Sequence, residues 1–258
     1  MKKLFIMLPA LLMPFIPLAA KEYSIKSPDK AYQLTVKAGE GPTTYSVSYK
    51  GTTVINHSNI GILEANGHQI GDGTVTSTSK SSHKGTVDVV VGKNDTLADN
   101  YNQLTITYDK GDYALTLRAY NQGVAFQWSL NYDREITVAN ELLEADFGTE
   151  PVKVHFPMCE MRSWEEKDLQ KQAHIINQAY RNFERAYVEY ESIAAIPDTV
   201  ISTSPALFTL PNGRTRVAVT EANVYDYPGL YLQPAGGEKI RGHWAGYPKS
   251  VLDGDPKN

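Results

Sequence analysis

The residues with the most evident chemical potential in this sequence are neighbouring carboxylates. Two close pairs occur, Glu165 with Glu166 and Glu189 with Glu191. Cleavage of a glycosidic bond uses two facing carboxyl groups, one as general acid and the other as base or nucleophile. The chain contains 29 acidic residues, so such pairs also arise by chance, and a solvated helix face is the simpler explanation for both. The carboxylates alone therefore do not define a catalytic site.

Other reactive residue types are present, but without the spacing that their usual chemistry requires. The six histidines are scattered, with no His-x-x-x-His pair of the kind that ligates zinc. The single cysteine, Cys159, follows an apolar stretch and is predicted to be a buried small hydrophobe rather than a nucleophile. Neither a Gly-x-Ser-x-Gly turn nor a phosphate-binding loop occurs. By spacing alone, no catalytic constellation stands out.

Aromatic side chains give a second kind of candidate site. The chain has 16 tyrosines and three tryptophans, whose amphipathic rings can stack on the faces of sugars. Tyr225, Tyr227 and Tyr231 cluster around a Pro-Gly turn, and Trp244 follows shortly afterwards. Two interpretations stay open for this cluster: packing at the rim of a β-sandwich, or contact with a ligand through Tyr227 and Trp244.

The elements that must position these residues are mostly β-strands. Short runs rich in Thr, Val and Tyr show apolar–polar alternation and are separated by turn residues. The predicted strands cover residues 32–36, 45–49, 86–91, 101–108, 113–120, 124–130, 152–156, 206–210, 214–220 and 230–232. The polar, serine-rich segment 74–85 is predicted to be a loop or a ragged edge. Because strands and helices do not alternate, the sequence predicts a mainly all-β fold of two packed sheets.

One segment departs from this pattern, between Ser163 and Glu191. Ser163 and Glu166 fit a capping box, and the segment contains neither Gly nor Pro. From Leu169 to Tyr187, apolar residues recur at three- and four-residue steps, which places them on one face of a helix. We therefore predict a helical insertion near 163–191, a loop enlarged to cover another surface.

The first 20 residues are predicted to be a secretory signal peptide. Lys2 and Lys3 precede an apolar stretch that ends in a small-residue cleavage site, Leu18-Ala19-Ala20. The stretch is shorter than the roughly 20 residues of a membrane span, so no span is expected after its removal. The sequence thus predicts a periplasmic or secreted protein. A single cysteine permits no internal disulfide, so the stability of the exported chain must come from its core.

Composition sets the broad class of the mature chain. With 258 residues, 41% hydrophobic and 21% charged residues, the chain is globular, and residues 21–258 are predicted to form one domain. The net charge is −4 and no Lys/Arg-rich run occurs. Such a surface repels phosphate backbones, which excludes nucleic acid as an expected partner.

Several short motifs follow one another along this domain. They are Ser27-Pro28-Asp29, Thr44–Gly51 with Ile60-Gly61-Ile62, Asn100–Leu104, Leu117–Phe126 and Thr220–Gly229. In order and spacing they resemble the N-terminal domain of glycoside hydrolase family 97, a family of exported, exo-acting α-glycosidases. Thr220 stands where histidine is common in that family.

The resemblance implies an N-terminal β-super-sandwich followed by a (β/α)₈ barrel that holds the catalytic carboxylates. A barrel by itself takes about 250 residues, so the catalytic residues are expected outside this sequence. The chain is then expected to be a fragment, a truncated gene product or one half of a split enzyme. Its implied partner is a catalytic barrel, in cis or in trans, and its implied ligand is an α-linked oligosaccharide.

The same resemblance implies one metal-ligating residue. In the family, a glutamate of this domain within a Glu-x-x-Tyr motif helps to bind a calcium ion at the mouth of the barrel. Phe183-Glu184-Arg185-Ala186-Tyr187 matches that motif, so Glu184 is the candidate calcium ligand, with Glu189 as the alternative. Because calcium takes roughly six to eight oxygen ligands, Glu184 would share the ion with the barrel. A charge on a helix surface is the structural alternative.

Three functional hypotheses follow from these observations. The first is a domain that buttresses the barrel of a calcium-dependent α-glucosidase or α-galactosidase and completes its pocket. The second is a free-standing carbohydrate-binding module that uses Tyr227 and Trp244. The third is a structural sandwich that pairs with another chain through an exposed apolar patch.

Overall fold

A computed structural model of the protein describes residues 20–90, 92–160, 187–198, 200–225 and 227–244. This part of the chain is built from antiparallel β-strands in three sheets. Its only helical elements are two short 3₁₀ turns, η1 (Asp109–Gly111) and η2 (Ile193–Ala195). No helix within these ranges is long and apolar enough to cross a membrane. The all-β class is as predicted, but the sheets number three rather than two.

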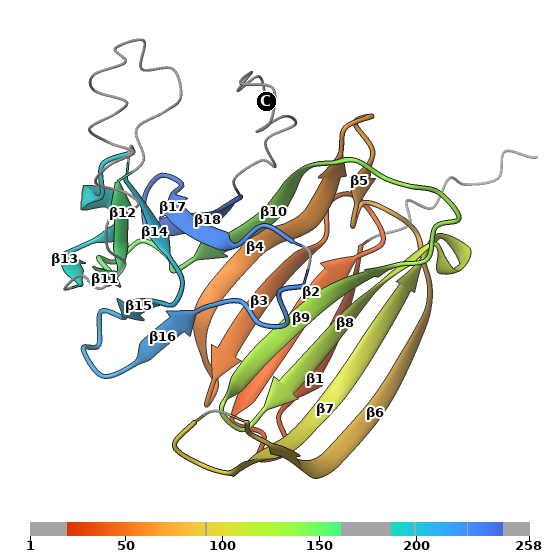
Figure 1. Cartoon of the computed structure of the whole chain (residues 1–258), viewed down its shortest axis with the longest axis horizontal. Coiled ribbons are helices and arrows are strands. Elements are labelled where there is room, and N and C mark those ends of the chain that lie inside the picture. The colour runs from red at the N-terminus through yellow and green to blue at the C-terminus, as the bar shows by residue number, and fades with distance from the viewer. Residues whose placement is uncertain (1–19, 91, 161–186, 199, 226, 245–258) are drawn as a thin grey trace, which may run out of the picture.

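The largest sheet has ten strands and runs through the whole molecule (Figure 1). Its order is β1-β2-β3-β4-β10-β18-β17-β14-β12, with β5 beside β4. The strands are β1 (Lys21–Lys26), β2 (Tyr32–Ala38), β3 (Thr44–Tyr49), β4 (Thr52–Glu64), β5 (Gln69–Ile70), β10 (Val138–Asp146), β12 (Met158–Glu160), β14 (Val200–Thr203), β17 (Leu230–Pro234) and β18 (Lys239–Trp244).

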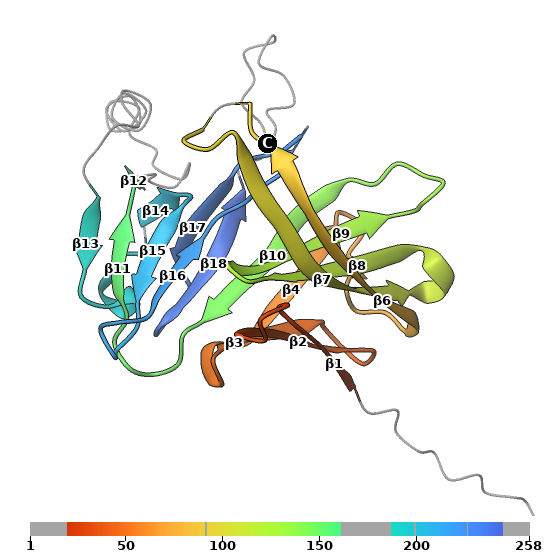
Figure 2. The ribbon, with the colours of Figure 1, turned by 90° about the horizontal axis from the view of Figure 1, so that it is seen from below.

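Two four-stranded sheets pack against different parts of the large sheet (Figure 2). The first has the order β6-β7-β8-β9 and faces β1 and β2. The second has the order β13-β11-β15-β16 and lies beside β14, β17 and β18. The bounds are β6 (Val75–Asp88), β7 (Thr96–Tyr108), β8 (Tyr113–Tyr120), β9 (Gly123–Leu130), β11 (Lys153–Phe156), β13 (Val188–Tyr190), β15 (Ala206–Thr209) and β16 (Arg216–Val219).

Alternation along the strands builds one continuous apolar core between the layers. Strand β8 alternates strictly between buried and partly exposed residues, as a strand with one face on the core must. Stacked rings join neighbouring elements: Tyr108 lies 4.9 Å from Tyr113 and Phe147 lies 4.8 Å from Phe208, centroid to centroid. The fully buried side chains include Leu34, Ile60, Leu104, Ile106, Leu115, Leu117, Phe156 and Phe208.

For residues 74–85 the prediction was a loop or a ragged edge. The loop is wrong, because residues 75–85 belong to the long strand β6, whereas the edge position is right, because β6 is an edge strand of its sheet. Most of β6 is exposed on both of its faces, so its sequence carries no apolar–polar alternation. Its pairing with β7, which extends from Val75 to Asp88, supplies the order instead. The predicted strand 86–91 correspondingly extends only to Asp88. Strands β4 and β10, which link the two parts of the large sheet, were not predicted.

The predicted helical insertion near 163–191 is corrected at its C-terminal end. Residues Val188–Tyr190 form the strand β13 and not a helix. The backbone of Glu189 pairs with that of His155 on β11. The alternating Val-Glu-Tyr sequence therefore forms an edge strand of this sheet. The remainder of the predicted helix, including Glu165, Glu166 and Glu184, lies outside the described residues.

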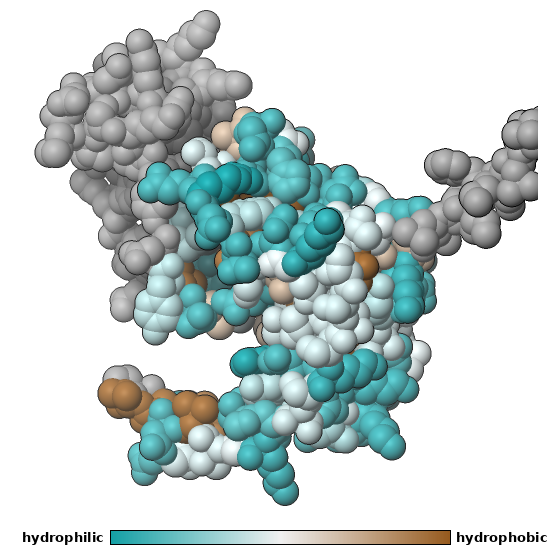
Figure 3. Space-filling view, turned by 90° about the vertical axis from the view of Figure 1, so that its right-hand side faces the viewer, coloured by the Kyte–Doolittle hydropathy of each residue, from teal (hydrophilic) through white to brown (hydrophobic). Residues whose placement is uncertain are grey.

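The end of the β6–β7 hairpin stands out from the body of the molecule (Figures 2 and 3). Figure 3 shows an apolar projection there, beside a mostly hydrophilic face. Three large apolar side chains are exposed at this end: Val87 (51%), Val90 (98%) and Leu97 (50%). Strand pairing continues out to Asp88 and Thr96, which makes the projection a regular hairpin.

Candidate functional site

The segment between β16 and β17, residues 220–229, carries the aromatic cluster singled out in the sequence. The carboxylate of Glu221 accepts the backbone N–H of Leu230, with both oxygens 2.9 Å from the nitrogen. Asn223 adopts a left-handed φ of 58°, a conformation that asparagine tolerates better than most residues. The segment is therefore anchored where it enters β17. Tyr225 is 80% exposed and Val224 45% exposed, so both side chains are available for contact.

Tyr227 is fixed to the large sheet by Glu141. Its hydroxyl donates a hydrogen bond of 2.9 Å to Oε2 of Glu141, which lies on β10. Burial raises the pKa of Glu141 and the nearby charge of Glu221 adds to this, while the bond from Tyr227 acts in the opposite direction. The pKa of Tyr227 is also raised, by burial and by the negative charge of Glu141. The phenol therefore stays protonated at neutral pH, with its proton directed to the carboxylate.

Trp244 lies close to this segment but is used in packing. It is opposite Leu230 in the β17–β18 pair, at the same end as Tyr227. Its ring contacts the core and lies over Gly242, where a Cβ atom would collide with it. The pKa of the adjacent His243 is lowered by burial and by the positive charge of Arg241. The structure thus brings the two predicted aromatic residues to one end of the sheet, with Tyr227 the more accessible of them.

The predicted alternative calcium ligand, Glu189, is already paired with basic side chains. Its Oε2 lies 2.7 Å from Nζ of Lys153, and its Oε1 lies 3.2 Å from Nδ1 of His155. The pKa of Glu189 is lowered, chiefly by Lys153 and to a smaller extent by His155. Within the described ranges, no group of three or more His, Cys, Asp or Glu side chains could hold a metal ion. Both carboxylate oxygens of Glu189 thus already have a basic partner, and its role as the alternative calcium ligand stays a prediction.

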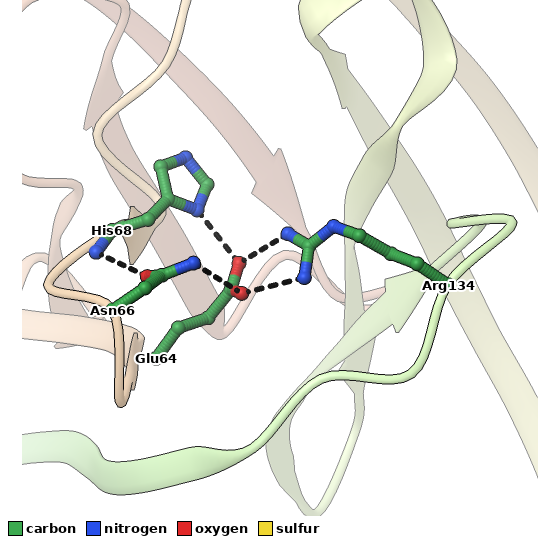
Figure 4. Close-up of polar contacts among 4 residues, drawn as sticks. All are labelled: Glu64, Asn66, His68 and Arg134. Atoms are coloured by element: carbon green, nitrogen blue, oxygen red, sulfur yellow. Dashed lines mark hydrogen bonds and ion pairs between the residues drawn. The ribbon is translucent and has the colours of Figure 1, made fainter.

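A buried carboxylate that sequence reasoning missed is Glu64, at the end of β4 (Figure 4). Its side chain is 2% exposed and forms a bidentate pair with Arg134, at 2.9 and 3.0 Å. His68 contributes a third contact at 2.8 Å and Asn66 a fourth at 3.3 Å. Arg134 first, and then His68, lower the pKa of Glu64 to about 2. Both oxygens of Glu64 are engaged by the protein, and the cluster joins β4 to the segment before β10.

The structure therefore defines one candidate functional site, consisting of segment 220–229 with Glu141. Glu221 and Tyr227 lie within a motif already visible in the sequence. Glu141 carries no sequence signal of its own, because it is 86 residues distant from Tyr227. The two carboxylates and two tyrosines of this site offer hydrogen-bond acceptors, a phenol and an exposed ring, which are groups that suit a hydroxylated ligand.

The single cysteine, Cys159, lies on β12, where its backbone pairs with that of Ile201 on β14.

A comparison with protein families matches residues 25–250 to the family described as Glycosyl-hydrolase 97 N-terminal. The curated relatives include a retaining alpha-galactosidase of Bacteroides thetaiotaomicron, 25% identical over 256 residues. The match covers 98% of this chain and 37% of that protein. The chain thus spans little more than a third of the length of this relative.

Solved structures show the same fold. A glycoside hydrolase family 97 enzyme from Pseudoalteromonas sp. strain K8, in complex with acarbose, superposes with a TM-score of 0.68 at 19% identity. The superposition covers 86% of this chain and 32% of that enzyme. A beta-arabinopyranosidase superposes with a TM-score of 0.67 at 21% identity, covering 85% of this chain and 35% of the other.

Proposed function

Because this chain belongs to the glycosyl hydrolase 97 N-terminal family, we propose that it is the non-catalytic β-domain of an exo-acting α-glycosidase. In this proposal the domain supports a (β/α)₈ catalytic barrel, supplied in cis or in trans, and completes the pocket for an α-linked sugar. The substrate of the whole enzyme is proposed to be an α-glucoside or an α-galactoside. The observation that carries the proposal is the family match over nearly the whole domain, combined with the much greater length of the relatives.

Segment 220–229 is the proposed contribution of this domain to the pocket. Its exposed Tyr225 and the Tyr227–Glu141 pair give it the groups that a sugar requires, a ring face and oriented polar atoms. The double anchor from Glu221 to Leu230 holds the segment in place before any ligand arrives. Pre-ordering of this kind reduces the entropy lost on binding.

A calcium ion and export to the periplasm are the two remaining parts of the proposal. Both rest on the sequence: calcium on the motif around Glu184, and export on the signal-like residues 1–20. Calcium bound there would supply a fixed positive charge at the junction with the barrel. Glu184 provides at most two of the required oxygens, so this chain by itself is expected to bind calcium weakly.

The central test is an assay of the purified chain on p-nitrophenyl α-glucoside and p-nitrophenyl α-galactoside. We expect no turnover above the buffer rate for either substrate, because the catalytic carboxylates are proposed to lie outside this sequence. Hydrolysis that co-purifies with the folded chain and is lost in an acidic-residue variant of it would refute the non-catalytic role.

The genomic context provides a second, independent test. We expect the DNA beyond codon 258 to encode a (β/α)₈ barrel, either in the same reading frame or in an adjacent gene. A locus without any barrel-encoding sequence would contradict the proposed partner, whatever the result of the assay.

A further inference from the structure

The outward face of the β6-β7-β8-β9 sheet carries a row of rings that the proposed function does not use. Tyr101 on β7 is paired across the strands with His83 on β6 and with Tyr120 on β8. The ring centroids of His83 and Tyr101 are 5.2 Å apart, and those of Tyr101 and Tyr120 are 5.1 Å apart. The core residue Leu104 points to the opposite face, so the row faces away from the core.

Polar side chains, Arg118 and Gln103, lie beside this row of rings. The guanidinium of Arg118 is 4.3 Å from the centre of the Tyr101 ring. It donates a hydrogen bond of 2.9 Å to Oε1 of Gln103 and one of 3.4 Å to the hydroxyl of Tyr120. Arg118 is thereby held against the rings and still has further N–H donors to offer. The row beyond Gln103 and Arg118 on the same face carries Ser79, Thr105 and Thr116, which add hydroxyl groups.

Small residues leave open space on the β9 side of the row. Gly123 is opposite Tyr120, and a Cβ atom built at Gly123 meets no other atom within 4 Å. Ala125 is opposite Arg118. The result is a shelf beside Tyr120 and Arg118 that larger side chains would have filled.

From this geometry we propose that the outward face of the β6–β9 sheet, centred on Tyr101, Tyr120 and Arg118, binds a neutral oligosaccharide. Rings match the apolar C–H faces of a sugar, while the guanidinium and amide match its hydroxyl groups. The charges on this face also favour a neutral ligand, because Asp99 lies 3.4 Å from His83 and its negative charge also acts on Arg118. We call this face, centred on Tyr101, Tyr120 and Arg118, the platform. The inference goes beyond the proposed function, because the platform needs no catalytic region and consists of other residues than segment 220–229.

Calorimetry on the purified chain tests the platform, with maltoheptaose as an α-glucosyl probe and verbascose as an α-galactosyl probe. We expect saturable binding of at least one of them and a loss of about tenfold or more in affinity for Tyr120→Ala. The matched control is Glu150→Ala, which removes an exposed side chain that belongs neither to this face nor to segment 220–229, and it is expected to leave this binding unchanged.

A second variant separates binding from a purely structural role of the aromatic row. Gly123→Val keeps every ring and fills the shelf, and its backbone φ permits a side chain. We expect it to weaken sugar binding while the thermal unfolding midpoint stays near that of the wild type. Three results would each overturn the proposed binding face. They are absence of saturable binding to both probes, full affinity in the folded Gly123→Val and Tyr120→Ala variants, and loss of binding in Glu150→Ala. None of these results depends on whether a catalytic partner exists.

Discussion

At the scale of single residues, two glutamates with similar numbers of partners have different roles. Glu64 is buried and bound by a guanidinium and an imidazole, whereas Glu189 is 53% exposed and bridges Lys153 and His155. Burial makes the first interaction strong, because charged hydrogen bonds strengthen where water is excluded. Water weakens the second by screening it. Of these two carboxylates, Glu64 is therefore expected to contribute more to stability.

The pH dependence of stability follows from the lowered pKa of Glu64, about 2 compared with its ordinary 4.5. A lowered folded-state pKa gives stability that is complete above pH 4.5 and is lost as the pH falls towards 2. We expect Glu64→Gln to lower the melting temperature at pH 7, and this difference from the wild type to shrink progressively below pH 4.5. Circular dichroism melts at pH 7, 4 and 3 measure it, with the exposed Glu150→Gln as control. A difference that is constant with pH would contradict the assignment.

At the scale of elements, the turn between β17 and β18 holds three separate segments together. The buried carboxylate of Glu238 accepts backbone N–H groups from Val152 at 2.9 Å and from Ile193 at 3.0 Å. A longer contact of 3.4 Å reaches Ala194 in η2. One side chain thus accepts the N–H group just before β11 and the N–H groups at the start of the 3₁₀ turn η2, which have no partner within a strand.

Removal of this carboxylate is expected to be costly. Glu238→Ala leaves buried backbone donors without acceptors, which costs about 1–3 kcal/mol for each group. We therefore expect a loss of roughly 3 kcal/mol in the free energy of unfolding, measured by urea denaturation. The matched control is Glu150→Ala, an exposed position where a change within about 0.5 kcal/mol is expected. Equal losses in the free energy of unfolding for the two substitutions would contradict the proposed role of the Glu238 carboxylate.

At the scale of the whole molecule, one large sheet is shared by two smaller sheets. Phe208, on β15, is fully buried where the sheet β13-β11-β15-β16 meets the large sheet. The centroid of its ring lies 4.8 Å from that of Phe147 and 6.2 Å from that of Phe156. Because the buried side chains form one continuous cluster, the two ends of the molecule share a core. The fold is therefore expected to unfold as a single unit.

Substitution in that shared core tests this expectation. Phe208→Ala is expected to cost about 3–5 kcal/mol through lost burial and a residual cavity. The adjacent Leu207→Ala, which changes the opposite face of β15, is expected to cost distinctly less. Urea unfolding monitored by both fluorescence and circular dichroism should show one coincident transition with a lower midpoint. Two separated transitions would show that the sheets fold independently.

The sequence alone determined the local structure wherever alternation was clear. The strands 101–108 and 113–120 and the turn between them were predicted because one face of each packs on the core. The same reasoning failed for β6, an edge strand with no buried face, and for β13, where a short alternating run had been included in a longer helical pattern.

Only the tertiary structure decided which distant residues meet. Glu141 and Tyr227, or Glu64 and Arg134, are separated by long stretches of chain, and their pairing depends on how β10 crosses the large sheet. The row of His83, Tyr101 and Tyr120 is likewise a product of strand register. Patterns along a chain reflect the environment of each residue, whereas the identity of its neighbours is fixed by the path of the backbone. The chemistry of this domain therefore lies in pairings that its sequence permits but does not display.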